Sequence, residues 1–289
     1  MIRLFVSDLD GTLLNEDHVV SKENIKAVEM LRHHGVSFMP ASGRDYLALQ
    51  QAIEPIDVRP KCIALNGAQF YDNQGNCLVV NPLERDAIVE IQAILDTFGL
   101  SPDYYATEGR YAFYEGDDFI GYVRERILRL FHGEKQENLD EIIKNFTKDY
   151  HVESNLTNIL DLEILKLEII CTDAQNKIDV QKALEVVQGI TVTSSHELNL
   201  EVNALAATKG HAIQQVCDVY GYKPEEVLVV GDGLNDISML EKFENSYAMG
   251  QASKTVKNAA NYVALSNEED GIAKLIYKVL EDNEKEANQ

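Results

Sequence analysis

Apolar and polar residues along the first 80 positions alternate between two kinds of pattern. Residues 2–7 (IRLFVS) form a short, mostly apolar run that predicts a buried strand. Residues 21–35 place apolar side chains every third position between a serine and a glycine, which predicts a helix with a cap at each end. Two further apolar runs, residues 36–44 and 61–68, each end in small or polar residues. Strands that alternate with helices in this way predict a parallel sheet covered by helices.

The same alternation returns in the last third of the chain. The expected elements are, in order, a helix over 209–221, a strand over 227–233, a helix over 235–243 and short strands over 246–250 and 262–265. The final residues, 281–289, are charged and lack an apolar face, so we expect them to fray. The two ends of the chain therefore predict one α/β core.

The middle of the chain, residues 83–206, has a different texture. Residues 85–99 fit a helix, and two aromatic runs on either side of residues 108–110 fit a hairpin. Residues 163–171 and 197–203 alternate apolar and polar side chains, as strands with one exposed face do. We interpret the whole as a doubly wound, Rossmann-like parallel-sheet core, residues 1–82 and 207–289, into which an α/β cap domain, residues 83–206, is inserted.

The length of the chain limits the number of domains, and its charge limits the kinds of partner that it can bind. The 289 residues suit one large domain or two moderate ones, and 26 Lys plus Arg against 48 Asp plus Glu give a net charge of −22. Such a surface repels nucleic acids and anionic membranes, so neither is an expected partner. No signal peptide or membrane-length apolar run is visible, which favours a cytoplasmic protein, and no obligate protein partner is evident.

Carboxylates follow two of the predicted strands. Asp8 and Asp10 end the first strand, while Asp232 and Asp236 follow the strand near residue 230. Two aspartates at the end of one strand often only cap a turn. Ligands, however, bind at the carboxyl ends of parallel strands, where the aspartates that follow both strands would meet. Clustered carboxylates raise one another's pKa unless a cation lies among them, and oxygen ligands without His or Cys favour Mg²⁺. None of the seven histidines falls in a strand-end motif.

Four ordered motifs carry a family resemblance. They are DLDGT (8–12), ASGR (41–44), ATKG (207–210) and GDGLND (231–236). In this order they resemble the haloacid dehalogenase superfamily of phosphotransferases, and ALNGA, AMGQASKTVKNAA and DGIAKLI are similar to segments of its Cof-type subgroup. The resemblance implies an α/β cap between the second and third motifs, which sets substrate specificity.

The resemblance also implies roles for particular residues. Asp8 would be the nucleophile, and Asp10 the general acid and base, with its backbone carbonyl on the metal ion. The metal ligands would be Asp8 and Asp232, with Asp236 binding the ion itself or supporting the groups that do. The groups expected to hold the phosphate are Ser42, the backbone amides of Leu9 and Gly43, Asn235 and the cationic Lys209. Arg44 and Asn66 are possible substrate contacts, with a structural role in their turns as the alternative.

The implied function is Mg²⁺-dependent hydrolysis of small phosphomonoesters through an aspartyl-phosphate. Sugar phosphates, nucleotides and phosphorylated cofactors are the expected substrates, because a cap over the strand ends would exclude larger ones. Two alternatives stay open at this point. One is a phosphomutase resembling the phosphomannomutases, which would depend on a bisphosphate activator. The other is a non-catalytic regulatory module that keeps the fold, which would release no phosphate.

Overall fold

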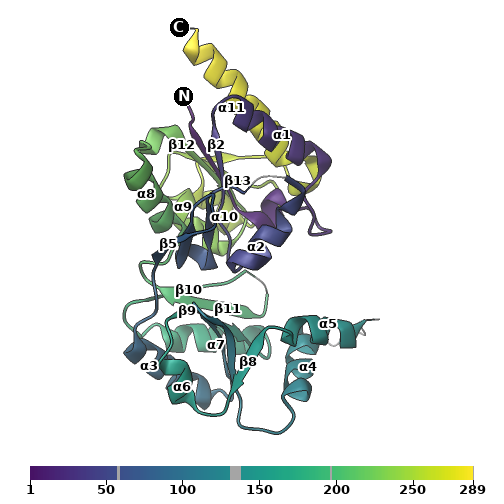
Figure 1. Cartoon of the computed structure of the whole chain (residues 1–289), viewed down its shortest axis with the longest axis vertical. Coiled ribbons are helices and arrows are strands. Elements are labelled where there is room, and N and C mark those ends of the chain that lie inside the picture. The colour runs from purple at the N-terminus through teal and green to yellow at the C-terminus, as the bar shows by residue number, and fades with distance from the viewer. Residues whose placement is uncertain (57–58, 131–137, 196, 289) are drawn as a thin grey trace. The chain divides into compact units, whose positions relative to one another are not determined.

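The computed structural model describes residues 1–56, 59–130, 138–195 and 197–288, and the chain divides into two compact units (Figure 1). Unit 1 combines Met1–Asn81 with Ala206–Gln289, and unit 2 is Pro82–Leu205. None of the helices in the described ranges combines the length and the apolar character that crossing a membrane requires.

A five-stranded sheet forms the centre of unit 1, and every neighbouring pair of its strands runs parallel. In spatial order the strands are β14 (Tyr262–Val263), β13 (Asn245–Ala248), β12 (Val227–Gly231), β1 (Leu4–Ser7) and β2 (Ser37–Pro40). The predicted α/β fold with a parallel-sheet core is confirmed. Because β1 lies between β12 and β2 and the three strands are parallel, the segments that follow them lie side by side at the carboxyl ends of the strands.

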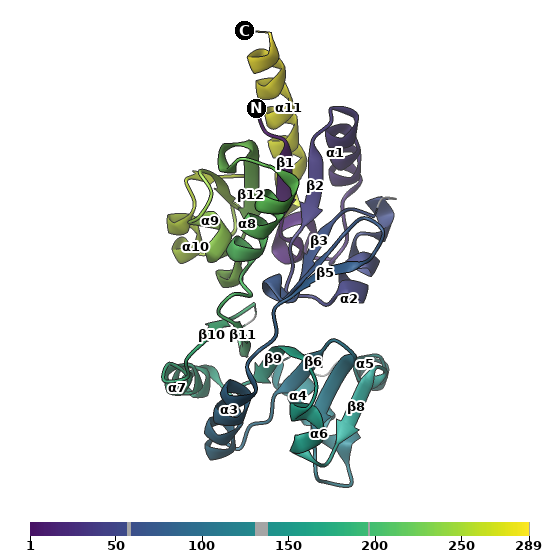
Figure 2. The ribbon, with the colours of Figure 1, turned by 60° about the vertical axis from the view of Figure 1, so that its left-hand side comes forward.

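Helices cover both faces of this sheet (Figure 2). The apolar cluster on one face includes Phe5 of β1, while Leu4 and Val6 belong to the cluster on the other face, as the alternation of side chains along a strand requires. The first face is covered by α1 (Lys22–His33), α2 (Tyr46–Ala52) and α11 (Gly271–Ala287), and the second by α8 (Lys209–Tyr220), α9 (Ile237–Leu240) and α10 (Lys254–Ala259).

The third predicted strand does not extend the parallel sheet. It forms β3 (Cys62–Ala64) of a separate antiparallel sheet with β4 (Gln69–Tyr71) and β5 (Cys77–Val80). A parallel bridge between Ala41, which directly follows β2, and Ile63 links it to the main sheet. The chain turns back directly after β3, where Asn66 adopts a left-handed conformation with φ 61°, and this reversal pairs β3 with β4.

The C-terminal segment was expected to fray, and this expectation is wrong, because α11 continues to Ala287. Asn283 accepts a hydrogen bond from the Ile2 amide at 2.7 Å and donates one to the Ile2 carbonyl at 2.8 Å, which attaches the helix to the start of the chain. Ion pairs one turn apart, such as Lys285 with Glu281 at 2.7 Å, add further support. Polar contacts thus replace the missing apolar face.

Unit 2 contains a six-stranded sheet that is antiparallel except between β7 and β8. Its strands are, in spatial order, β10 (Ile190–Thr193), β11 (Asn199–Ala204), β9 (Ile164–Ile170), β6 (Asp103–Ala106), β7 (Gly109–Phe113) and β8 (Tyr150–Glu153). Its helices are α3 (Arg85–Thr97), α4 (Phe119–Leu130), α5 (Leu139–Thr147), α6 (Leu156–Leu160) and α7 (Ala174–Leu184). The predicted hairpin is confirmed as β6 and β7.

The polar face of this sheet is buried, although its alternating sequence predicted an exposed face. Lys166 of β9 and Glu201 of β11 are each only 3% exposed. They form an ion pair at 3.4 Å, and Tyr105 donates a hydrogen bond to Glu168 at 2.7 Å. Polar side chains can be buried when they form hydrogen bonds or ion pairs with one another. The alternation of apolar and polar residues therefore did not show whether the polar face of the sheet is exposed.

Candidate active site

The site begins where β1 ends. Asp8 directly follows β1, and its backbone amide donates to the Val230 carbonyl of β12 at 2.9 Å, so the pairing of the two strands positions it. The chain then turns through residues 9–13, with Gly11 at φ +76°. A Cβ on Gly11 would lie 2.4 Å from Oδ2 of Asp232, so only glycine allows this close approach.

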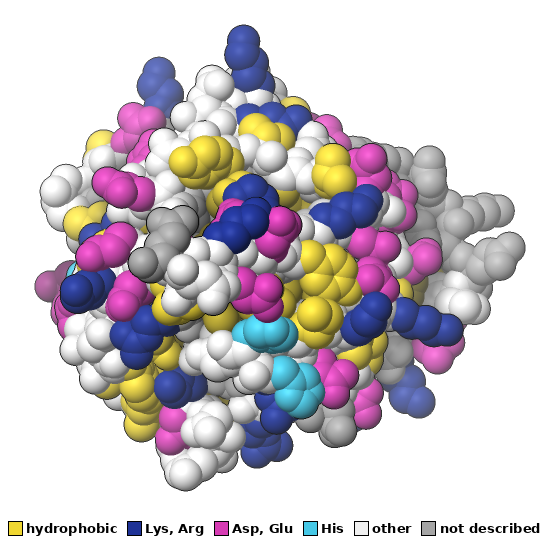
Figure 3. All heavy atoms as spheres, turned by 90° about the horizontal axis from the view of Figure 1, so that it is seen from above, with side chains coloured by type: hydrophobic (Ala, Val, Ile, Leu, Met, Phe, Trp, Pro, Cys, Tyr) yellow, Lys and Arg dark blue, Asp and Glu magenta, His cyan; other side chains and the backbone are white. Residues whose placement is uncertain are grey.

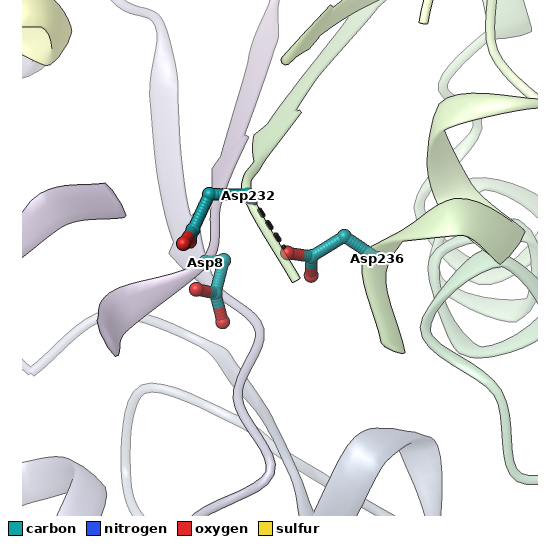
Figure 4. Close-up of side chains that lie close together, drawn as sticks. All are labelled: Asp8, Asp232 and Asp236. Atoms are coloured by element: carbon teal, nitrogen blue, oxygen red, sulfur yellow. Dashed lines mark hydrogen bonds between the residues drawn. The ribbon is translucent and has the colours of Figure 1, made fainter. Parts of the chain in front are cut away.

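Three carboxylates from the two strand ends meet here (Figure 4). Carboxylate oxygens of Asp8, Asp232 and Asp236 all lie within 4.8 Å of one another. Asp236 accepts hydrogen bonds from the amides of Asp232 at 2.9 Å and Gly233 at 2.8 Å, which closes the turn that follows β12. Thr12 donates its hydroxyl to Asp232 at 2.7 Å. The turns after β1 and β12 therefore hold the cluster together.

Lys209 supplies the positive charge of the cluster. Its Nζ donates to Oδ1 of Asp8 and to Oδ1 of Asp236, both at 2.6 Å, and the side chain is completely buried. Lys209 is the first residue of α8, whose preceding residue, Thr208, accepts a hydrogen bond from the His211 amide as a helix cap. The start of α8 thus places the ammonium group between two carboxylates.

The charges at the site do not balance. Burial and repulsion from Asp236 raise the pKa of Asp8 well above its usual range, although Lys209 opposes this shift. Burial, again with repulsion from Asp236, raises the pKa of Asp232 to about 6. Burial by itself would lower the pKa of Lys209, but Asp236 and Asp8 outweigh it and raise that pKa, so the ammonium group stays charged.

This donor set fits a hard divalent cation. Three carboxylates face one ammonium group, which leaves an excess of negative charge, and every ligand atom in the cluster is an oxygen. Oxygen ligands suit Mg²⁺ and not the softer metals that prefer nitrogen or sulfur. A cation among the three carboxylates would offset the repulsion that contributes to the raised pKa values of Asp8 and Asp232.

Asp10 lies outside this cluster and pairs with Arg44. Its two carboxylate oxygens accept hydrogen bonds from Arg44 Nε at 2.8 Å and Nη2 at 2.6 Å. His18 Nδ1 lies 3.6 Å from the same carboxylate. Burial alone would raise the pKa of Asp10, but the hydrogen bonds and charge of Arg44 outweigh it and lower that pKa. Arg44, a candidate substrate contact, therefore binds the candidate general acid in this structure.

The remaining candidates occupy the loops that follow β2 and β3. Ser42 is buried, and its hydroxyl accepts a hydrogen bond from the Arg44 amide at 3.1 Å. The Asn66 amide donates to the Ser42 carbonyl at 2.9 Å, which joins the two loops. Asn235 donates its side-chain amide to Asn66 Oδ1 at 3.1 Å. Gly43 follows Ser42 in the first loop, and Leu9 opens the turn after β1.

Two contacts near the site were missed from the sequence. His18 approaches Asp10, and Gln251 donates its side-chain amide to the Gly11 carbonyl. Gln251 lies in the segment AMGQAS, which had been noted only as part of the family resemblance. His18 does not follow a predicted strand. Gln251 directly follows the strand predicted over residues 246–250, but its uncharged amide gave no signal for catalysis or metal binding.

Comparisons with known proteins agree with this geometry. A family model described as haloacid dehalogenase-like hydrolase matches residues 5–276. A 5-amino-6-(5-phospho-D-ribitylamino)uracil phosphatase of Bacillus subtilis is 28% identical over 275 residues, which cover 95% of this chain and 94% of that protein. A phosphatase of Escherichia coli with the same substrate in its name is also 28% identical, over 96% of both chains.

Solved structures show the same fold. A haloacid dehalogenase-like hydrolase from Bacillus subtilis superimposes with a TM-score of 0.80 at 24% identity, covering 96% of this chain and 99% of that one. A protein from Streptococcus mutans gives a TM-score of 0.79 at 22% identity, with 97% and 99% of the two chains covered.

Proposed function

The chain belongs to the haloacid dehalogenase-like hydrolases, as a phosphatase of the Cof type, and from this premise we propose that it hydrolyses small phosphomonoesters with the help of Mg²⁺. One observation carries the proposal: the buried Lys209 ammonium group joins Asp8 and Asp236, and Asp232 lies beside them. A lysine in this place can attract a phosphate group to a carboxylate that would otherwise repel it.

We assign the metal site to carboxylates of this cluster. Asp8 and Asp232 would bind Mg²⁺ together with the backbone carbonyl of Asp10, and Asp236 would bind it directly or hold the groups that do. When bound, the ion would withdraw negative charge from the phosphate group and neutralise the excess of carboxylates.

The chemistry of the chain's own residues then has two steps. An oxygen of Asp8 attacks phosphorus, the bond from phosphorus to the substrate oxygen breaks, and Asp10 donates a proton to that leaving oxygen. In the second step Asp10 takes a proton from water, which attacks the phosphorus of the aspartyl-phosphate. Inorganic phosphate leaves and the carboxylate of Asp8 is restored.

Further groups would hold the phosphate during both steps. We propose that Ser42, the amides of Leu9 and Gly43, Asn235 and Lys209 donate to its non-bridging oxygens. The loop contacts support this assignment, because Asn235 and Ser42 are both tied to Asn66. Such donors act strongly when they are fixed before the reaction begins.

For the substrate we propose a small phosphorylated metabolite. The relatives named above are phosphatases of a phosphorylated ribitylaminouracil, and a sugar alcohol phosphate of that kind is one candidate. We assign the choice among such molecules to unit 2, the insertion Pro82–Leu205. Its pattern of apolar and polar residues differs from that of the core, and it contributes none of the carboxylates of the cluster.

The test is phosphate release from a panel of sugar phosphates, nucleotides, phosphorylated cofactors, phosphopeptides and the phosphorylated ribitylaminouracil. We expect metabolites to exceed phosphopeptides in kcat/KM, chelation to stop turnover and Mg²⁺ to restore it. Asp8→Asn should abolish turnover and leave the circular dichroism spectrum unchanged, since the amide keeps the shape and loses the nucleophilic anion. Full activity of Asp8→Asn, or of the exhaustively chelated protein, would contradict the proposal.

A further inference from the structure

A cavity of 450 Å³ lies at the opposite ends of the strands from the carboxylates. Leu4 and Ser37, the first residues of β1 and β2, line it, whereas Asp8 follows the far end of β1. Four strand residues span about 13 Å, so the cavity is separate from the candidate active site. Its volume falls within the range of small-molecule sites.

Part of the cavity lining is apolar. It includes Met39 and Val216, from the apolar cluster on one face of the sheet, and Phe38, from the cluster on the other face. Tyr222 adds an aromatic ring, and its hydroxyl forms a 3.0 Å hydrogen bond with Ser37. The lining therefore offers apolar and aromatic groups to the body of a small organic ligand.

Three cations line the same cavity, namely Arg32 at the end of α1, and Arg59 and Lys61 before β3. Within the described ranges, none of the three has a carboxylate within salt-bridge distance, although the chain carries 48 acidic residues. Lys61 instead lies with Nζ 3.5 Å from the centre of the Tyr220 ring, and partial burial lowers its pKa. Seen from the end of unit 1 at which both termini lie, cationic, acidic and apolar side chains are intermingled (Figure 3).

Isolated surface arginines are ordinarily solvated and need no ligand. These cations differ because they line one cavity together with apolar residues. The chain also carries 48 acidic residues that could have paired with them. Charges of one sign that converge on a concave surface concentrate ions of the opposite sign there. The cavity thus combines the two features that recognise an organic anion.

We propose that this cavity is a second ligand site, which binds a small organic anion. The flat, apolar body of the ligand lies against the apolar part of the lining, and its phosphate or carboxylate group meets the three cations. The ligand is not turned over, because the nucleophile lies beyond the other end of β1. The proposal is independent of the catalytic assignment, since it uses none of the residues of that site.

The test uses 2-naphthoate, a flat aromatic carboxylate. The chain has no tryptophan, so the probe can be excited at wavelengths that its tyrosines do not absorb. The fluorescence anisotropy of the probe then reports its binding. We expect saturable binding of one probe per chain. The double variant Arg32→Ala/Arg59→Ala should bind at least about tenfold more weakly, because it removes two charge-assisted contacts. Its turnover of a phosphomonoester should stay unchanged.

Lys26→Ala is the matched control, because it removes one exposed positive charge from the same helix, α1, outside the cavity. It should bind the probe as the wild type does. Asp8→Asn, which changes the candidate active site and no residue of the cavity, should also bind the probe as the wild type does. The proposal is overturned by an absence of saturable binding, by equal affinity of the double variant, or by a changed affinity of the probe in Asp8→Asn.

Discussion

Asp10 and Asp8 lie two positions apart in the motif DLDGT, yet their carboxylates have opposite surroundings. Burial and the neighbouring Asp236 raise the pKa of Asp8, so its ionised form is disfavoured without a cation. Arg44 outweighs the effect of burial on Asp10 and lowers the pKa of that carboxyl, so its ionised form is favoured. The proposed first step needs a proton on Asp10, and Arg44 opposes its uptake.

Arg44→Met tests this opposition, because methionine keeps an unbranched apolar side chain and removes the charge. We expect the pKa of Asp10 to rise, so the group keeps its proton to higher pH. The alkaline limb of the dependence of kcat/KM on pH, which reports loss of that proton, should then move to higher pH. Arg44→Lys keeps the charge and should move the limb less. An alkaline limb that stays in place in Arg44→Met would refute the assignment of Asp10 as the acid.

At the scale of elements, the turn after β1 connects the backbone conformation to the chemistry. Its Gly11 is left-handed and lies against Asp232, and Gln251 donates to its carbonyl. A side chain at this position would strain the left-handed backbone and would also push the carboxylate of Asp232 away. These two effects can be separated, because Gly35 after α1 has a similar φ of +71° with no atom within 4 Å of an added Cβ.

We therefore expect Gly35→Ala to lose about 1–2 kcal/mol of stability, the cost of a left-handed residue with a Cβ, and Gly11→Ala to lose at least as much, because its Cβ also meets Asp232. Urea unfolding measures this loss. Gly11→Ala alone should also lose phosphatase activity and need more Mg²⁺ for half-maximal rate, since its Cβ would push Asp232 away. Equal activity of the two variants would show that the close approach to Asp232 does not matter.

In unit 2, one buried carboxylate joins two strands and a helix. Asp103 of β6 is completely buried and accepts hydrogen bonds from Arg110 of β7 at 2.7 Å and Arg126 of α4 at 2.6 Å. Burial alone would raise its pKa, but the two arginines outweigh it and lower the pKa to about 2. The stabilisation is therefore present above the usual pKa of 3.8 and is lost as the pH falls toward 2.

Asp103→Asn should destabilise unit 2 strongly at neutral pH. It leaves two largely buried arginines without their anion, and breaking such an arrangement costs about 3–5 kcal/mol. Asp161→Asn is the control, because its pair with Arg85 is exposed and worth at most about 1 kcal/mol. Urea unfolding followed by tyrosine fluorescence compares the two. A loss no larger than that of the control would show that the ion cluster is not needed for stability.

At the scale of the whole molecule, the carboxylate cluster makes the stability of the metal-free protein depend on pH. The pKa of Asp232 rises from 3.8 to about 6 on folding, and that of Asp8 rises as well. A group with a raised pKa favours the folded state at low pH, and this contribution is lost as the pH rises through the folded value. Near neutral pH the ionised cluster therefore opposes folding unless a cation neutralises it.

Mg²⁺ should consequently raise the Tm of the chelated protein by several degrees at pH 7.5 and by much less at pH 4.5, where Asp232 is protonated. Differential scanning calorimetry with and without Mg²⁺ at each pH measures the effect, with KCl at equal ionic strength as the control for screening. Asp232→Asn should remove most of the shift at pH 7.5. A shift of the same size at both pH values would mean that Mg²⁺ binds elsewhere.

Local patterns predicted much of this molecule and failed in identifiable places. The apolar runs predicted strands β1, β2 and β12 of the parallel sheet, and the caps around α1 and the apolar period of α8 marked those helices correctly. The same rules misplaced β3, because a turn decided its pairing partner. They also missed the helical end of α11 and the burial of Lys166, because both depend on polar contacts with residues distant in sequence.

By itself the sequence determined the class of fold and the family, because hydrophobic period, helix caps and the order of motifs are properties of short segments. Only the tertiary structure decided which charges meet. Lys209 and Asp8 are 201 positions apart, and Arg44 and Asp10 are 34 apart. The packing of β1, β2 and α8 places the ammonium group of Lys209 on Asp8 and the guanidinium group of Arg44 on Asp10. Since charge interactions depend on distance and burial, the opposite pKa shifts of Asp8 and Asp10 could arise only after the chain had folded.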